Sequence, residues 1–180
     1  MAGTCRVHLL GGFEVEVDGH AVPDAAWRGR STDVVLHLAV EPTHHLTAGE
    51  IGARIWPSAS TREAEHELAK AVKDARKALG DGRAVTTEGE RLRLWPHGEL
   101  WVDVHTFAAR AKHARSPEMR EEALAMYRGD LLPDWPDPAL DGLRTRLRLT
   151  QLELQRDPNG LTPAWVDLRT PLRDVVPYRS

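Results

Sequence analysis

The chain has 180 residues, of which 41% are hydrophobic, and its 24 Lys and Arg against 27 Asp and Glu give a formal net charge of −3. This length suits one ordinary domain or two small ones, and no apolar run is long enough to predict a transmembrane span or a signal peptide. We therefore expect a cytoplasmic protein with no membrane partner. The charge excludes global basicity, so nucleic-acid binding requires a local basic patch.

The N-terminal residues alternate between apolar and polar side chains, as half-buried strands do. Two such stretches, Arg6 to Leu10 and Phe13 to Val17, are followed by a turn signal at Asp18-Gly19. The single cysteine, Cys5, excludes an internal disulfide and is expected to be a small buried residue of an N-terminal strand. The pattern predicts a small antiparallel sheet.

Two helices are predicted next. Residues 32–40 are dense in Val, Leu and Ala and lack Gly and Pro, which favours a largely buried helix. The second helix is expected to begin after Thr47, which is spaced to form a capping box with Glu50. It should end near Trp56, because Pro57 disfavours helical geometry in the residue before it.

A long helical pattern runs from Ser60 to Gly80. Ser60 and Glu63 are spaced as a second capping box, and Gly80 supplies a left-handed stop. An apolar stripe at helical spacing predicts one buried face. Its members are Ala64, Leu68, Val72, Ala75 and Leu79. Because only residues 57–59 separate this helix from the previous one, the pair is a helix-turn-helix candidate.

A hairpin is predicted directly after the long helix. Residues 84–87 and 91–94 have the pattern of short strands around a turn that contains Gly89, and a hairpin in this position is a wing. Residues 100–103 favour one more brief strand. For residues 1–102 we therefore predict a small antiparallel sheet with a winged helix-turn-helix, so that the fold class of the chain is α+β.

The composition becomes helical from residue 105. A first helix is followed by one that begins at Ser116-Pro117 and is expected to reach Gly129, and a Leu-rich helix follows a loop rich in Pro and Asp. We expect a small all-α domain over residues 103–154 and an irregular Pro-rich tail over residues 155–180.

No group of residues predicts catalysis. The Ser, His and Asp residues are too common to indicate a triad. The pair His44-His45 is assigned to a loop and has no Cys or carboxylate at ligand spacing. Gly11-Gly12 lacks the strand and helix context of a phosphate loop. We therefore predict a protein without enzymatic activity, metal or cofactor.

The basic residues of the long helix are more informative. Lys70, Lys73 and Lys77 are three and four residues apart, so their ammonium groups lie along one face and suit the phosphates of double-stranded DNA. The same helix carries five Lys and Arg against four acidic residues, so an ordinary solvated face is the competing interpretation. The candidate DNA-binding residues are Arg62, His66, Lys70, Lys73, Arg76, Lys77, Arg91 and Arg93.

Five segments, in this order, resemble the Streptomyces antibiotic regulatory protein family of the AfsR/DnrI type. They are VHLLGGFEVEVDGHAV (Val7 to Val22), LTAGEIGARIWPSAS (Leu46 to Ser60), TTEGERLRL (Thr86 to Leu94), WVDVHTFAARAKHAR (Trp101 to Arg115) and MYRGDLLPD (Met126 to Asp134). The first three are similar to that family's OmpR-type winged helix. The last two are similar to the bacterial transcriptional activator domain that follows it, here in a shortened form.

The resemblance implies a tetratricopeptide-like second domain and a transcription regulator that binds direct repeats at promoters, often as a homodimer, and contacts RNA polymerase. In this hypothesis the long helix enters the major groove, with His66, Lys70 and Lys73 nearest the base edges and the remaining candidates on phosphates. Two alternatives stay open. One is a protein-interaction module with a degenerate, non-DNA-binding winged helix, which Glu65 and Asp74 favour; the other is a scaffold that dimerises through the Leu-rich helix.

Overall fold

The computed structural model describes residues 3–156, and the chain divides into two compact units. Among the described residues, the first unit comprises residues 3–7 together with Glu14–Val102, and the second comprises His8–Phe13 together with residues 103–156. The sequence alone does not predict that His8–Phe13 belongs to the helical unit. Of the tail predicted for residues 155–180, residues 157–180 lie outside the described residues. Residues 155 and 156 are the last two residues of the final helix.

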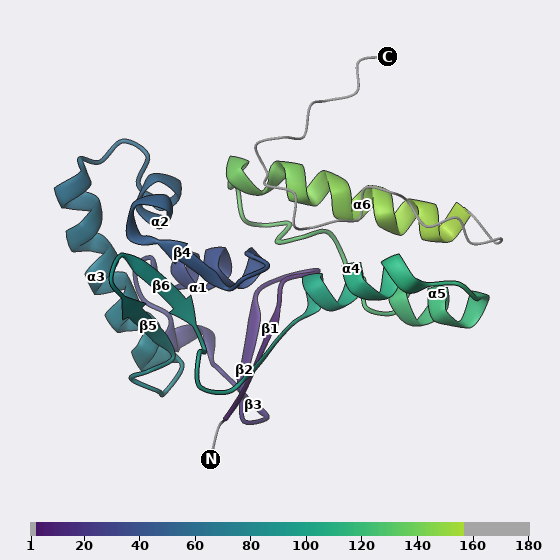
Figure 1. The fold of residues 1–180 in the computed structure, drawn as a ribbon, viewed down its shortest axis with the longest axis horizontal. Helices are drawn as coiled ribbons and strands as arrows, with labels where there is room; N and C mark the ends of the chain where they lie inside the picture. The colour runs from purple at the N-terminus through teal and green to yellow at the C-terminus, as the bar shows by residue number, and fades with distance from the viewer. Residues whose placement is uncertain (1–2, 157–180) are drawn as a thin grey trace. The chain divides into compact units, whose positions relative to one another are not determined.

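The first unit contains two small sheets and three α-helices among its described residues (Figure 1). The strands are β1 (Thr4–His8), β2 (Glu14–Val17), β3 (His20–Ala21), β4 (His45–Thr47), β5 (Val85–Glu88), β6 (Arg91–Leu94) and β7 (Glu99–Val102). The helices are α1 (Ser31–Val40), α2 (Ala48–Ile55) and α3 (Thr61–Ala78), and a 3-10 turn covers Asp24–Ala26. α1 is the central helix, since it contacts α2, α3 and β6 and is buried along nearly its whole length.

The larger sheet has the strand order β3-β2-β1-β7. β2 and β3 are antiparallel as predicted, whereas β1 and β7 are parallel, with Cys5 opposite Leu100. Cys5 is fully buried, as expected, and its burial raises the pKa of the thiol to about 12. β1 ends at His8 rather than at the predicted Leu10, because the N–H groups of Leu9 and Leu10 donate to a side chain of the second unit.

The smaller sheet has the strand order β4-β6-β5, in which both pairs are antiparallel. The β5–β6 hairpin is the predicted wing. β4 is a correction to the sequence analysis, which assigns His44-His45 to a loop: His45 is the first residue of β4 and pairs with Arg93. The preceding His44 has a φ of 54°, a left-handed turn that lets the chain enter the sheet.

The helix-turn-helix is confirmed at both predicted capping boxes. Thr47 and Glu50 cap α2, while Ser60 and Glu63 cap α3, each pair exchanging side-chain and backbone hydrogen bonds. The two helices approach closely, because a Cβ atom at Gly52 would lie only 3.3 Å from the Cβ of Ala64. α2 and α3 therefore form one rigid pair whose first turns are both fixed by side chains.

The second unit is helical. Its elements are α4 (Asp103–His113), α5 (Pro117–Leu124), the 3-10 turn Pro138–Leu140 and α6 (Asp141–Arg156). α5 ends five residues before the predicted Gly129. There the ring of Tyr127 packs against Phe107 at a centroid distance of 5.2 Å, and its hydroxyl donates to Asp130 at 2.7 Å, so tertiary contacts replace the last helical turn.

Asp103, at the start of α4, is the anchor of the His8–Phe13 segment. Its carboxylate is 1% exposed and accepts hydrogen bonds from the backbone N–H groups of Leu9, Leu10 and Val104 at 2.7–3.0 Å. Burial raises the pKa of this carboxyl, and the three backbone donors oppose that rise by favouring the charged form. The Asp103 carboxylate thus accepts the backbone hydrogen bonds that a neighbouring strand would accept if β1 continued through Leu9 and Leu10.

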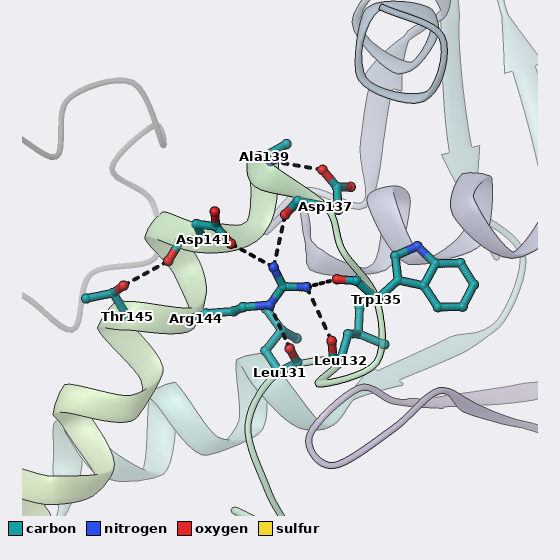
Figure 2. A network of polar contacts seen from close by, with 8 residues as sticks. All are labelled: Leu131, Leu132, Trp135, Asp137, Ala139, Asp141, Arg144 and Thr145. Carbon is teal, nitrogen blue, oxygen red and sulfur yellow. Dashed lines mark hydrogen bonds and ion pairs between the residues drawn. The ribbon is translucent and has the colours of Figure 1, made fainter.

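Arg144 of α6 holds the loop that precedes the helix (Figure 2). Its guanidinium donates to the carbonyl oxygens of Leu131 (3.0 Å), Asp137 (3.0 Å), Leu132 (3.3 Å) and Trp135, and to the carboxylate of Asp141 (2.8 Å). Leu132 has a φ of 46°, which a non-glycine residue adopts only when its surroundings fix it. One planar side chain therefore satisfies several carbonyl groups of an irregular loop.

We expect Asp103→Asn to lower the free energy of unfolding by about 2–4 kcal/mol, because an amide NH₂ would face at least one buried backbone donor and each unpaired buried group costs about 1–3 kcal/mol. Urea titration measures the change. Asp134→Asn, at an exposed position of the same unit, is the matched control and should change little. Equal stability of the two variants would contradict the anchoring role of Asp103.

We expect Arg144→Lys to destabilise the protein by about 2 kcal/mol, since a single ammonium group cannot donate to carbonyls on several sides and each lost bond is worth about 1 kcal/mol. Thermal and urea unfolding provide the measurement. The control is Arg148→Lys, because Arg148 has a side chain that is 68% exposed and lies 4.0 Å from Asp130. A cost for Arg144→Lys no larger than that of the control would show that the loop does not depend on the guanidinium.

Candidate nucleic-acid interface

The orientation of α3 is set by its apolar stripe. Leu68, Ala71, Val72 and Ala75 are buried, and so is Leu79 at the C-cap. Four of the five residues of the predicted stripe are therefore buried, while Ala64 is half-buried and Ala71 joins the stripe. Burial of this face fixes which side chains of the helix face solvent.

The exposed face of α3 is basic. At about 100° per residue, five of the predicted residues fall within about 80° of the helix circumference. They are Arg62, His66, Lys70, Lys73 and Lys77, and all five are exposed. We call this set the basic stripe. It contains no carboxylate, although the helix as a whole is nearly neutral.

The acidic residues of α3 lie beside the basic stripe rather than within it. Glu63, Glu67 and Asp74 follow on one flank within about 40° of one another, while Glu65 lies on the other flank. Glu63 belongs to the capping box, where hydrogen bonds from Ser60 lower the pKa of its carboxyl. Glu67 links this flank to the basic stripe through a contact with Lys70.

Glu67 forms an ion pair with Lys70 at 2.8 Å, and the hydrogen bond from Lys70 lowers the pKa of the Glu67 carboxyl. Both side chains are about half exposed, at 46% and 57%. An ion pair in water contributes little to stability, because solvent screens the charges and two flexible side chains must be ordered. A phosphate group can therefore compete for Lys70.

Arg76 differs from the other predicted residues because it is half-buried. Its Nε donates to the carbonyl oxygen of Val85 at 2.7 Å. Val85 is the first residue of β5, so this bond joins the last turn of α3 to the wing. At about 60° from Lys73 around the helix, Arg76 lies at the edge of the basic stripe.

The two predicted wing residues, Arg91 and Arg93, are exposed and alternate with the buried Leu92 and Leu94. In the strand register, Arg91 lies opposite Glu88 of β5, whereas Arg93 lies opposite Thr86 of β5 and His45 of β4. The pairing gives Arg91 an acidic neighbour and gives Arg93 none. β4, which sequence reasoning misses because its three residues are too few for a strand pattern, supplies His45 to this face.

Metal-binding clusters and membrane-spanning helices would indicate other kinds of site in the described residues. Over residues 3–156 there is no cluster of His, Cys, Asp or Glu suited to a metal ion. None of the helices in this range combines the length and the apolar composition needed to cross a bilayer. The candidate residues for a nucleic-acid interface stay those predicted from the sequence, which are the basic stripe, Arg76 and the two wing residues.

The pair α2–α3 is a helix-turn-helix, and the β5–β6 hairpin follows it. β4, which precedes α2, pairs with β6 of that hairpin. This arrangement defines a winged helix. The sequence matches no protein-family model and no curated protein. Among solved structures, the chain is similar to EmbR of Mycobacterium tuberculosis, determined in complex with a low-affinity phosphopeptide. The TM-score is 0.70 at 19% identity, and the match covers 85% of this chain and 44% of EmbR.

This similarity shows a shared fold, a winged helix joined to a helical unit. The chain spans less than half the length of the EmbR chain, whose coverage is 44%. The tetratricopeptide-like character of the helical unit and the predicted domain boundaries, 1–102 and 103–154, are not tested by it and stay predictions. The same holds for the roles of the eight candidate residues.

His44, at the entry to β4, gives the winged-helix unit a pH dependence. Burial lowers the pKa of its imidazole, and the nearby charges of Arg93 and His45 act in the same direction. The unfolded chain therefore takes up this proton first as the pH falls below about 6.5, so the folded state loses stability towards pH 5.

We expect His44→Asn to reduce this loss, because Asn does not titrate and tolerates the left-handed backbone of position 44. Urea unfolding at pH 7.5 and pH 5 measures the difference between wild type and variant. His45→Asn is the neighbouring control. An unchanged pH dependence in His44→Asn would show that other groups carry the effect.

Proposed function

We propose that this protein is a DNA-binding transcriptional regulator, in which α3 enters the major groove and the β5–β6 hairpin contacts the DNA backbone. The observation that carries the proposal is the separation of charge on α3. The basic stripe gathers five side chains on the solvent face, while three carboxylates lie together on one flank. A phosphate approaching the stripe meets positive charge, although the helix total is close to neutral.

In this mechanism the phosphate contacts orient the protein and the base contacts select the sequence. His66, Lys70 and Lys73 lie on the middle turns of α3 and are the candidates for base edges in the major groove. The proposed phosphate contacts are Arg62, Arg76, Lys77, Arg91 and Arg93. Lys70 would leave its ion pair with Glu67 to bind DNA, and the loss of this pair costs little free energy because both side chains are solvated.

The finer family assignment is part of the same proposal. The OmpR-type winged helix, membership in the AfsR/DnrI-type family, binding as a homodimer, contact with RNA polymerase and a cytoplasmic location all rest on the resemblance of the five segments. The shared fold with EmbR supports this direction without deciding it. We retain the absence of enzymatic activity as a prediction of the same kind.

The alternative is a protein-interaction module whose winged helix does not bind DNA. The acidic flank formed by Glu63, Glu67 and Asp74 is the observation that favours it. Gel-shift titration of the full chain against random-sequence duplexes, at rising salt, separates the two functions. A regulator should give a saturable shift that weakens with salt, whereas an interaction module should give none even at low salt.

We expect the double variant Arg62→Ala and Lys77→Ala, which removes two proposed phosphate contacts of the basic stripe, to weaken DNA binding and to lower the slope of log K against log salt concentration by about 2, since each phosphate contact contributes about 0.9. Fluorescence anisotropy over a salt series gives the slope. Lys112→Ala changes an exposed lysine of α4 and is the matched control. An unchanged slope in the double variant would remove the basic stripe from the proposed interface.

A further inference from the structure

We infer that Arg76 is a positioning residue that couples the wing to α3, so that the wing is best aligned for DNA while Arg76 holds β5. The inference rests on the proposed function and deepens it. The two regions that meet DNA are separated in sequence by the turn of residues 79–84. Arg76 spans that turn with a single hydrogen bond, from its Nε to the carbonyl oxygen of Val85.

The Nε edge of the Arg76 guanidinium binds β5, whereas the Nη1 and Nη2 edge is proposed to bind DNA. The Nε bond to Val85 is 2.7 Å long and partly buried, so water competes for it less than for a surface contact. Within residues 3–156, no other hydrogen bond or ion pair of Arg76 occurs. The Nη1 and Nη2 groups form the opposite end of the planar fork and can donate in parallel to one phosphate.

Val85 is well placed to transmit this contact. It is fully buried, and it pairs with Leu94 at the base of the hairpin. Arg93, the wing residue without an acidic neighbour, is next to Leu94 in β6. The strand that carries Arg93 also pairs with β4, and the bond from Arg76 to the Val85 carbonyl adds a direct constraint between this strand pair and α3. The distance from α3 to the Arg93 guanidinium is then set by the fold rather than by a flexible turn.

Two substitutions separate the tasks of Arg76. In Arg76→Gln the side-chain Nε2 occupies the position of the arginine Nε, so the bond to Val85 can form while the charge and the outer fork are lost. In Arg76→Lys a methylene replaces Nε, so the bond to Val85 is lost while the positive charge remains. Lys77→Ala removes a neighbouring exposed charge and serves as the control, because over residues 3–156 Lys77 forms no hydrogen bond or ion pair with the wing.

The experiment is a double-mutant cycle with Arg93→Ala, measured by anisotropy on a duplex selected by the wild-type protein and at a temperature where urea curves show every variant folded. We expect Arg76→Lys to weaken binding about tenfold in the wild-type background and less than about threefold in the Arg93→Ala background, because the Arg93 contact that Arg76 positions is already absent there. Arg76→Gln and Lys77→Ala should each lower the salt slope by about 1 and act independently of Arg93→Ala.

Independent effects of Arg76→Lys and Arg93→Ala would overturn the positioning role while leaving DNA binding intact. Equal coupling of Arg76→Gln and Arg76→Lys to Arg93 would overturn it as well, since the Nε bond would then not be the cause. If the wild-type chain gives no saturable binding, the proposed function fails and the inference falls with it. The three results are distinguishable, because only the last removes binding by every form of the protein.

Discussion

The burial of one face of α3 is the constraint on which the candidate interface depends. Leu68, Val72 and Ala75 commit the helix to a single rotation against the core. Because successive residues differ by about 100°, a shift of one residue would carry the acidic flank to the surface that the basic stripe now occupies. The capping boxes of α2 and α3 fix where each helix begins, so the register of the helix-turn-helix does not slide.

In the second unit, charged side chains form hydrogen bonds with the backbone groups of irregular segments. Asp103 has only acceptors and satisfies the N–H groups of Leu9 and Leu10, whereas Arg144 has only donors and satisfies carbonyl groups of the loop before α6. In each case one charged side chain replaces the partners that a strand or helix would provide. Arg76 uses the same chemistry in the first unit, with a single carbonyl group.

The predictable features are those whose causes lie within a few residues. The capping pairs, the stop at Gly80 and the wing alternation all depend on short spacings, and each is confirmed. The parallel pairing of β1 with β7 and the bond from Arg76 to Val85 depend on residues that meet only in the folded chain. The placement of β4 beside Arg93 is of the same kind, because three residues carry too little pattern to predict a strand.

The net charge of α3 does not predict which of its faces could bind DNA. Five Lys and Arg against four carboxylates give α3 a net charge too small to predict DNA binding. The net charge does not take into account that charges on different faces of a helix screen one another unequally. Of the four carboxylates, Glu63 is used by the helix cap and Glu67 by Lys70. What an approaching phosphate meets is the face, and on α3 that face carries Arg62, His66 and the three lysines. The spacing of these residues along the helix, together with their exposure in the fold, therefore supports the proposal of DNA binding where the summed charge leaves it open.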